Sequence, residues 1–483
     1  MAAAGEVQQK EGMIAQLKGF ERAFWMVNIM EMFERLAYYG VRVVIPIYIA
    51  QADEIGGLHF SQIDKGWIFF SWAMVQSLVP VFSGGFADRY GYKKTIAFSI
   101  VIKIIGYLMM ATMTDYWGFL IGCCVLAAGT AIFKPGVQGT LVRTLNNKNS
   151  SVGWGTFYML VNIGGFLGPP LAHFLYGWSW PVVFYGCAVI VSLNFLMLLT
   201  YKEVSAGGDQ TGNTWTIAKT TFKNICQPRL ALFILIMSGF WLMFMQLFDM
   251  LPNFIVDWVD SSMIVERFSL PDGMTMTTDR GRQITQEWLI NANAGFIVIA
   301  VVFVSWLVAK MRRVTSIFIG ILISSVGLIA AGFTMSGYFC LLGILIFSLG
   351  EMLASPKMNE YLGVIAPEGE KALYMGYANI PLAIGWAYGS WKGGEVYGTY
   401  GEKATLALNY LAEKLSITEG IVRTNAFAKL QEHMGINAAD ATKLLWDTYH
   451  PFEIWYQFAA YGFAAAIGIF FYSRWVKKYE KGI

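Results

Sequence analysis

Six polar side chains share one face of the helix that we predict for residues 31–42, EMFERLAYYGVR. Counted from the first, they follow at steps of three, four, seven, eight and eleven residues, which is the spacing of one helical face. They are Glu31, Glu34, Arg35, Tyr38, Tyr39 and Arg42. Carboxylates take up and release protons, a guanidinium binds a carboxylate through two parallel hydrogen bonds, and phenol hydroxyls donate or accept between them. The residue types therefore indicate proton and carboxylate chemistry.

Largely apolar residues continue on both sides of this stretch, so the charged face lies inside a segment long enough to cross a bilayer. Each charge at membrane depth costs on the order of 2.5 to 3.5 kcal/mol on insertion scales. The face must therefore meet a polar cavity or opposite charges. An ion-pair patch that only joins helices is one interpretation, and a chemical role is the working hypothesis.

The composition is that of a polytopic membrane protein rather than a soluble enzyme. Of the 483 residues, 56% are hydrophobic, 16% aromatic and only 14% charged. The net charge of +3 is small and its basic residues fall mostly in short loops, so nucleic acid is excluded as a partner. The spacing of the five cysteines fits neither a metal site nor a disulfide framework, and we expect no metal and no cofactor besides protons. Charged residues precede the first apolar run, so we expect no removable signal peptide.

Twelve stretches have the length and hydrophobicity of membrane spans, six on each side of a polar linker. We place them at about 20–50, 63–86, 94–113, 117–141, 152–176, 179–200, 229–258, 287–309, 314–334, 338–364, 370–399 and 452–475. The predicted organisation is a cytoplasmic N-terminus (1–19), a six-helix bundle (20–200), a cytoplasmic linker (201–228), a second six-helix bundle (229–475) and a cytoplasmic tail (476–483). Lysine and arginine gather in the loops on the side of both termini, which predicts that both termini are cytoplasmic.

Two segments break the spanning pattern, 260–286 and 400–451, and both are expected on the outer side. The second is predicted to be helical, with Ser416 and Glu419 spaced as a capping box at a helix start. It is either a solvated cap on the outer rim or a docking surface for another protein.

The loop GGFADRYGYKK, residues 84–94, resembles the signature loop of the major facilitator superfamily. Its glycines allow close helix approach, and its basic residues can pair with acids across the cytoplasmic mouth. The resemblance implies a fold of twelve transmembrane helices in two six-helix bundles. It also implies that Asp88 and Arg89 belong to a latch that closes the inner gate.

Four further motifs resemble the proton-coupled oligopeptide transporter family. EMFERLAYYGVR is similar to the family's first-helix ExxERFxYYGxR motif, with Leu36 in place of Phe. FKPGVQG (133–139), FYMLVNIGG (157–165) and GEMLASP (350–356) resemble its fourth-, fifth- and tenth-helix motifs, with Gly136 where the fourth-helix motif has Asn. The four motifs follow the family's order and cover both bundles.

This resemblance implies roles for individual residues. Glu31, Glu34 and Arg35 would form a proton-responsive cluster with which Lys134 pairs. Arg35, Lys134 and the tyrosines Tyr38 and Tyr39 would line the site, with Arg35, Lys134 and Tyr39 holding a peptide's carboxylate. Asn162, Glu351 and Asn293 would receive its amino end. Two opposed charged groups on different bundles would then select a short backbone with little selectivity for side chains.

The sequence departs from the family pattern in the seventh helix, where Met245 replaces an acid that normally pairs with the residue matching Arg42. Asp249 lies one turn further along and is the predicted replacement at this outer gate. Lys103 and Lys357 have no counterpart in the pattern, and each is expected either to pair locally, Lys357 with Glu360, or to create an anion site. The four histidines lie in or beside external segments, so we assign them no proton relay.

We therefore expect a proton-coupled transporter, not an enzyme, that takes up dipeptides and tripeptides by alternating access. The expected setting is a bacterial inner (plasma) membrane, with the lipid bilayer as surroundings and a monomeric state. Two alternatives stay open. One is proton-coupled efflux or uptake of another small solute, and the other is a transporter-like scaffold that binds a partner through 400–451.

Overall fold

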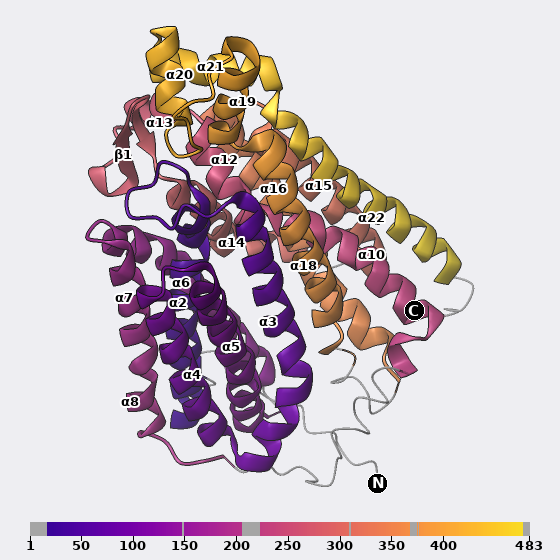
Figure 1. Cartoon of the computed structure of the whole chain (residues 1–483). Coiled ribbons are helices and arrows are strands. Elements are labelled where there is room, and N and C mark those ends of the chain that lie inside the picture. The colour runs from indigo at the N-terminus through magenta and orange to yellow at the C-terminus, as the bar shows by residue number, and fades with distance from the viewer. Residues whose placement is uncertain are drawn as a thin grey trace, which may run out of the picture.

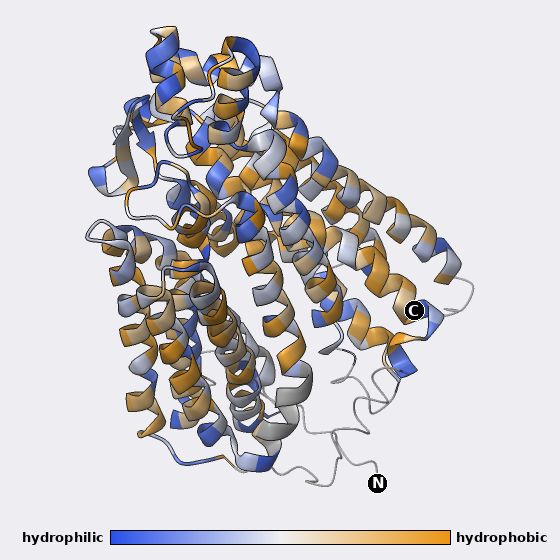
Figure 2. Ribbon diagram, in the orientation of Figure 1, coloured by the Kyte–Doolittle hydropathy of each residue, from blue (hydrophilic) through white to orange (hydrophobic). Residues whose placement is uncertain are grey.

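The computed structural model describes residues 17–146, 149–204, 223–308, 311–367, 374 and 376–476. Within these residues the chain is almost entirely helical and forms two groups of long helices, one from each half of the sequence (Figure 1). Apolar residues dominate the long helices, whereas polar residues are more frequent in the short helices at one end (Figure 2). The two-bundle arrangement predicted from the hydrophobic pattern is present.

The N-terminal bundle consists of one long helix per span, except for the sixth. Its helices are α2 (Arg22–Ala50), α3 (Gln62–Tyr90), α4 (Tyr92–Thr112), α5 (Tyr116–Thr144), α6 (Ser150–Tyr176), α7 (Trp180–Ser192) and α8 (Asn194–Leu198). A capping box begins α3, where the Ser61 hydroxyl accepts from the Asp64 N–H and the Asp64 carboxylate accepts from the Ser61 N–H.

The C-terminal bundle is less regular. The helices of its spans are α10 (Pro228–Phe244), α11 (Gln246–Asp249), α12 (Leu251–Trp258), α14 (Gln286–Val308), α15 (Arg313–Gly332), α16 (Gly337–Ile365), α18 (Asn379–Val396) with the π-helical turn η2 (Tyr397–Gly401), and α22 (Ile454–Val476). The seventh span is interrupted at Met245 and Met250, and Pro252 stands in the first turn of α12. This interruption lies beside the cavity described below.

Seven segments in the described part of the chain are long and apolar enough to cross a membrane. They are 92–112, 116–144, 180–198, 228–249, 313–332, 337–365 and 451–476. α2 is not among them although it has 29 residues, because its polar face carries too many charges for a composition test. The same charged residues that suggest a chemical role for α2 therefore lower its hydropathy below that of a typical membrane span.

The two predicted insertions lie at the same end of the molecule, which we call the cap end (Figure 1). The first contains α13 (Ser262–Phe268), the 3₁₀ turn η1 (Asp272–Met274) and a hairpin of β1 (Thr275–Thr278) and β2 (Gly281–Ile284), paired antiparallel with Thr275 opposite Ile284. The second contains α19 (Lys403–Leu415), α20 (Ala426–Met434), α21 (Ala438–Tyr449) and the 3₁₀ turn η3 (Pro451–Glu453). We call residues 402–449 the cap.

The prediction that the second insertion is helical is confirmed, but the predicted helix start at Ser416 is wrong. Ser416 has φ 55°, a left-handed conformation that ends α19. The next helix begins only after Asn425, whose side-chain oxygen accepts from the Val422 N–H. A capping-box spacing cannot distinguish a residue that begins a helix from one that ends it.

The bundles touch closely at the cap end through α3 and α18. A Cβ atom built on Gly66 would lie 2.8 Å from the Ser390 carbonyl oxygen and 3.2 Å from the Gly394 Cα. One built on Gly394 would lie 2.4 Å from the Gln62 carbonyl oxygen. Glycine at these positions therefore permits backbone contact between the bundles.

We predict that Gly66→Val prevents this contact and impairs transport at least tenfold without unfolding the protein, because the added carbons meet backbone atoms that cannot rotate away. Uptake into liposomes and thermal unfolding in detergent measure the two effects. Gly155→Ala is the control, since nothing lies within 4 Å of a Cβ at that position. Normal transport by Gly66→Val would show that the close approach is not needed.

Candidate functional site

A cavity of about 320 Å³ lies between the two bundles. Its walls come from α2, α3, α5 and α6 of the first bundle and from α10, α11, α14, α16 and α18 of the second. The predicted site residues that line it are Arg35, Tyr38, Tyr39, Arg42, Lys134, Asn162, Asn293 and Glu351. The structure thus brings together eight residues that are up to about 300 positions apart in the sequence, which is the placement expected of a central binding site.

Glu31 and Glu34 do not line the cavity but lie behind Arg35. The Arg35 Nε lies 3.2 Å from a Glu31 oxygen, and its guanidinium also pairs with Glu34. All three side chains are buried. A proton that reaches this pair of carboxylates therefore changes the partners of a cavity-lining guanidinium.

Lys103 of α4 completes this cluster. Its ammonium lies 3.1 Å from Glu34 Oε1 and 3.6 Å from the centre of the Phe133 ring, and the side chain is fully buried. Gly129 on α5 makes room, since a Cβ there would lie 2.7 Å from Lys103 Cγ. Of the two expectations for Lys103, local pairing is confirmed, and its unknown partner is Glu34.

Lys134 takes a different place from the one that the family resemblance implies. Among the contacts of the described residues it forms no ion pair with Glu31 or Glu34, whose ion-pair partners are Arg35 and Lys103. Two acids and two bases balance in the buried cluster. Lys134 is therefore left facing the cavity with a charge that the cluster does not neutralise.

Glu351 is the corresponding carboxylate on the opposite bundle. The Asn293 amide donates to its Oε2 at 3.0 Å and to the Ser348 hydroxyl at 2.8 Å. No cation is paired with Glu351 in the part of the chain that the structure describes. The cavity thus combines an unneutralised base on α5 with an unneutralised acid on α16.

The remaining predicted residues are held by neighbours. Gln76 donates to the Tyr38 hydroxyl at 3.2 Å, and the Tyr38 and Tyr39 rings meet edge to face with centroids 5.3 Å apart. The Asn162 amide donates to the Tyr158 carbonyl oxygen of its own helix at 2.7 Å, which leaves its side-chain oxygen for other partners. These groups add hydrogen-bonding capacity to the charged walls.

Arg42 and Asp249 form the predicted ion pair between α2 and α11. Arg42 also donates to the Phe248 carbonyl oxygen at 3.3 Å, and its guanidinium lies over the Phe69 and Trp386 rings. Both charged side chains are almost completely buried. This chain has Met245 at the position where the family pattern has an acid. Asp249 supplies the acidic partner of Arg42 instead.

Further hydrogen bonds join the bundles in the cap half of the molecule. His173 Nδ1 and the Tyr176 hydroxyl both contact Glu287 Oε1, the latter at 2.7 Å. Lys65 Nζ donates to Asn253 at 2.7 Å, and the Asn291 amide donates to the Phe166 carbonyl oxygen at 2.9 Å. These bonds fasten the N-terminal bundle to the C-terminal bundle on the cap side of the cavity. The sequence analysis assigned no role to His173. Its partner, Glu287, becomes visible only when α6 packs against α14.

The predicted inner latch is only partly visible. The Asp88 side chain lies outside the described part of the structure, and Arg89 is exposed with its guanidinium 5.7 Å from the Tyr90 ring. The Lys93 N–H donates to the Glu203 carboxylate at 3.2 Å. The latch role of Asp88 and Arg89 stays a prediction.

The other unmatched base, Lys357, pairs with Glu360 at 2.8 Å as predicted. No cluster of three or more His, Cys, Asp or Glu side chains suited to a metal occurs within the described ranges. Proton and ion-pair chemistry are what the cavity residues offer.

Comparison with known proteins gives the family. The chain matches the Major Facilitator Superfamily over residues 27–390, and it belongs to that superfamily. It is therefore a multi-pass membrane transporter, and the predicted twelve-helix major facilitator fold is confirmed.

The sequence relatives and the solved structures that resemble this chain differ in their substrates. The multidrug resistance protein MdtH of Yersinia enterocolitica is 21% identical over 397 residues, which cover 80% of this chain and 89% of MdtH. The solved structure of the POT family transporter PepTSo is 17% identical with a TM-score of 0.65, covering 95% of this chain and 99% of that one. The nucleoside transporter NupG gives a TM-score of 0.68 at 13% identity, covering 93% and 99%. The similarity to PepTSo and NupG agrees with the major facilitator fold of this chain.

We predict that Arg42 and Asp249 are energetically coupled, since removing either one leaves a buried charge without its partner. Asp249→Asn and Arg42→Gln should each lower the unfolding temperature and transport. The double variant should cost less than the sum of the two, with a coupling energy of about 0.5 to 3 kcal/mol in a double-mutant cycle. Additive effects of the two substitutions would mean that the ion pair between Arg42 and Asp249 does not contribute to stability or transport.

We also predict that Lys103→Met destabilises the protein by about 3 kcal/mol, because Glu34 then keeps only Arg35 as a partner in a buried site. Thermal unfolding in detergent measures this loss. Lys134→Met is the matched control and should change the unfolding temperature less, since Lys134 has no ion pair with Glu31 or Glu34 among the described contacts. Equal stability losses would contradict the assignment of Lys103 to the cluster.

Proposed function

We propose that this transporter takes up small zwitterionic peptides together with protons. The observation that carries the proposal is the pair of unneutralised charges in the cavity, Lys134 on one bundle and Glu351 on the other. A short peptide has one carboxylate and one ammonium group, so it neutralises both at once. In a low-dielectric cavity each charge-assisted hydrogen bond is stronger than its neutral counterpart.

The buried cluster supports coupling to protons. Protonation of Glu31 or Glu34 removes a negative charge from Arg35 and leaves its guanidinium partly unpaired. A substrate carboxylate in the cavity then becomes its preferred partner. Binding of the proton and binding of the substrate thus favour each other through the same side chain.

The arrangement of the bundles supports alternating access. Hydrogen bonds join the N-terminal and C-terminal bundles at the cap end, from α2, α3 and α6 to α11, α12 and α14. If the cap end faces outward, as the distribution of basic residues predicts, these bonds close the outer end of the cavity. Return to the outward-facing state requires these bonds to break.

Efflux of an apolar compound is the second candidate function. The wall that α10, α11 and α18 contribute is apolar and aromatic, with Trp241, Phe244, Met245, Phe248 and Trp386. The sequence relatives named MdtH are described as multidrug resistance proteins. Such a wall suits apolar substrates, which would leave Lys134 and Glu351 without a substrate charge to bind.

Transport into liposomes distinguishes the two candidates. Purified protein is tested with labelled peptides, amino acids, nitrate and a lipophilic cationic dye, with and without a proton gradient directed inward. The proposal expects peptides to accumulate when protons flow in the same direction. Movement of the dye against the proton flow, with no peptide uptake, would establish efflux instead.

We predict that Glu351→Gln abolishes accumulation of peptides, because an amide cannot supply the negative charge that holds an ammonium group. N-acetylated peptides should compete poorly with free peptides for the unmodified protein. Competition for uptake measures both effects. Glu395→Gln is the control, since Glu395 forms an exposed pair with Lys392 away from the cavity. Unchanged affinity for acetylated peptides would rule out this role of Glu351.

A further inference from the structure

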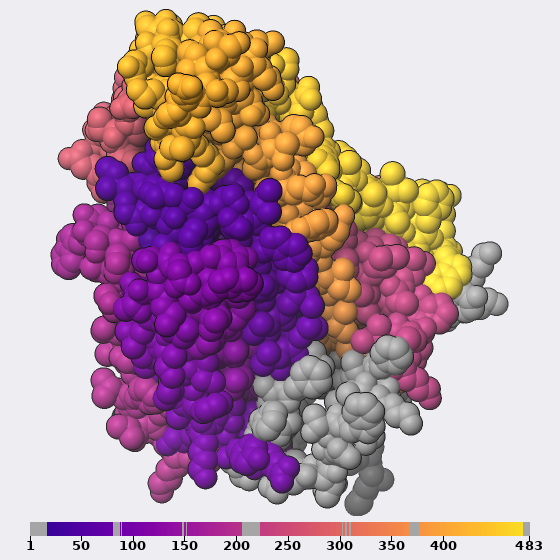
Figure 3. Space-filling model, viewed as in Figure 1, coloured from indigo at the N-terminus to yellow at the C-terminus, as the bar shows by residue number. Residues whose placement is uncertain are grey.

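We propose that Arg423 of the cap is a gate residue that holds the cap end closed by linking the C-terminal bundle to the connection between α2 and α3. This inference rests on the alternating access of the proposed function, and it does not depend on which substrate is carried. It gives the second insertion a part in the transport cycle, in addition to covering the rim. Figure 3 shows the orange and yellow cap resting on the indigo part of the N-terminal bundle.

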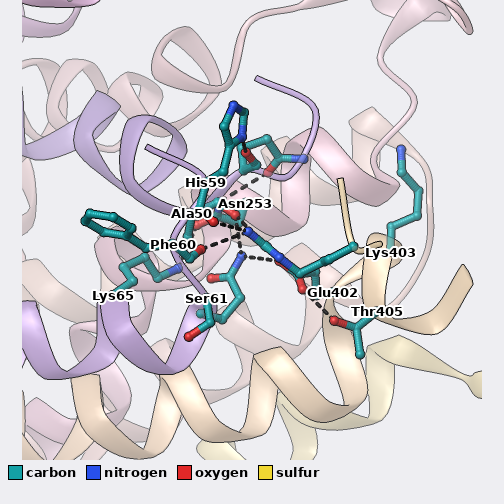
Figure 4. A network of polar contacts seen from close by, with 12 residues as sticks. Ala50, His59, Phe60, Ser61, Lys65, Asn253, Glu402, Lys403 and Thr405 are labelled. Carbon is teal, nitrogen blue, oxygen red and sulfur yellow. Dashed lines mark hydrogen bonds and ion pairs between the residues drawn. The ribbon is translucent and has the colours of Figure 1, made fainter. Parts of the chain in front are cut away.

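Arg423 makes four hydrogen bonds with its two terminal nitrogens. One nitrogen donates to the Ala50 carbonyl oxygen at 3.1 Å and to Glu402 Oε1 at 2.6 Å. The other donates to the carbonyl oxygens of His59 and Phe60 at 2.7 and 3.0 Å. Figure 4 shows Ala50, His59, Phe60 and Glu402 converging on this point. Three of the four acceptors belong to the N-terminal bundle.

One of these acceptors, the Ala50 carbonyl oxygen, lies at the C-terminal end of α2. Ala50 is the last residue of α2, and the last carbonyl oxygens of a helix have no partner within it. The C-terminal end of a helix also carries a partial negative charge, which favours a cation there. Arg423 therefore caps α2 from the opposite bundle. Lysine has three donors at one point and cannot reproduce this fork.

The cap itself is attached to the C-terminal bundle. The Trp258 ring packs on Trp446 of the cap with centroids 5.7 Å apart, and the Trp258 indole N–H donates at 2.7 Å to the carbonyl oxygen of Gly401, the residue that precedes the cap. The Lys403 N–H donates to Asp257 at 3.2 Å. Glu402, nearly buried, holds Arg423 on this side. The cap should therefore move with the C-terminal bundle.

Opening of the cap end would consequently separate Arg423 from Ala50, His59 and Phe60 while its bond to Glu402 persists. The Gln62 amide, which also donates to Glu402 at 3.0 Å, would separate with them. The three lost carbonyl contacts stabilise only the closed arrangement. They should shift the equilibrium between the two states toward closure at the cap end.

The test measures how often the cap end opens, with spin labels at Ile55→Cys and Asp447→Cys. Both positions are exposed, one on each side of the closed end, and the exposed native Cys226 is replaced by serine together with Cys124. The full-length protein in liposomes is measured without substrate or proton gradient. Arg423→Gln should raise the ratio of open to closed populations at least about tenfold, since hydrogen bonds to charged groups are lost. Arg423→Lys should give a smaller increase in the same direction.

Lys429→Gln is the matched control, because Lys429 forms an exposed ion pair with Glu432 within the cap, where both residues lie in the second insertion. It should leave the distances unchanged. Unchanged distances in Arg423→Gln and Arg423→Lys would overturn the proposal, and if the first variant does not fold, the second decides. A chain that proves to export its substrate would still show the shift, so failure of the proposed function and failure of this inference remain distinguishable.

Discussion

The cost of burying a charge without a partner determines how this protein is built. The polar face of α2 carries two acids and two bases, and both bases, Arg35 and Arg42, are paired with acids. Lys103 brings a further positive charge from α4 to Glu34. Because the pairing is complete within the cluster, Lys134 and Glu351 stand out as the cavity groups that a substrate can neutralise. The same constraint that stabilises the fold thereby defines the chemistry of the binding site.

The second consequence concerns movement. Polar contacts between the bundles lie in the cap half, where Arg42 meets Asp249, Tyr176 meets Glu287 and Arg423 meets the end of α2. Once the cap end opens, water can replace each of these hydrogen bonds. The free-energy difference between the closed and open states is therefore modest. A transporter needs such a balance, since it must pass through both states in each cycle.

The sequence predicted the features that depend on one helix or one motif. The polar face of α2, the spans of the two bundles and the contact between Arg42 and Asp249 followed from spacing, hydropathy and the need for an opposite charge. Partners contributed by other helices did not follow, because spacing within one helix says nothing about packing between helices. Lys103 was left with two possible roles, and Arg423 was not noticed at all. Ser416 was misread, since its left-handed φ is fixed by the end of α19 and not by the residues that come after it.

Movement of protons caused by the substrate is the most direct test of the central claim. A pH-sensitive dye is enclosed in liposomes that contain the protein, with equal pH on both sides, and a dipeptide is added outside. The account predicts that the lumen acidifies as peptide enters, and that Glu351→Gln abolishes the signal. Alkalinisation of the lumen would mean exchange of substrate for protons, and an unchanged pH during peptide uptake would mean that the buried cluster does not couple transport to protons.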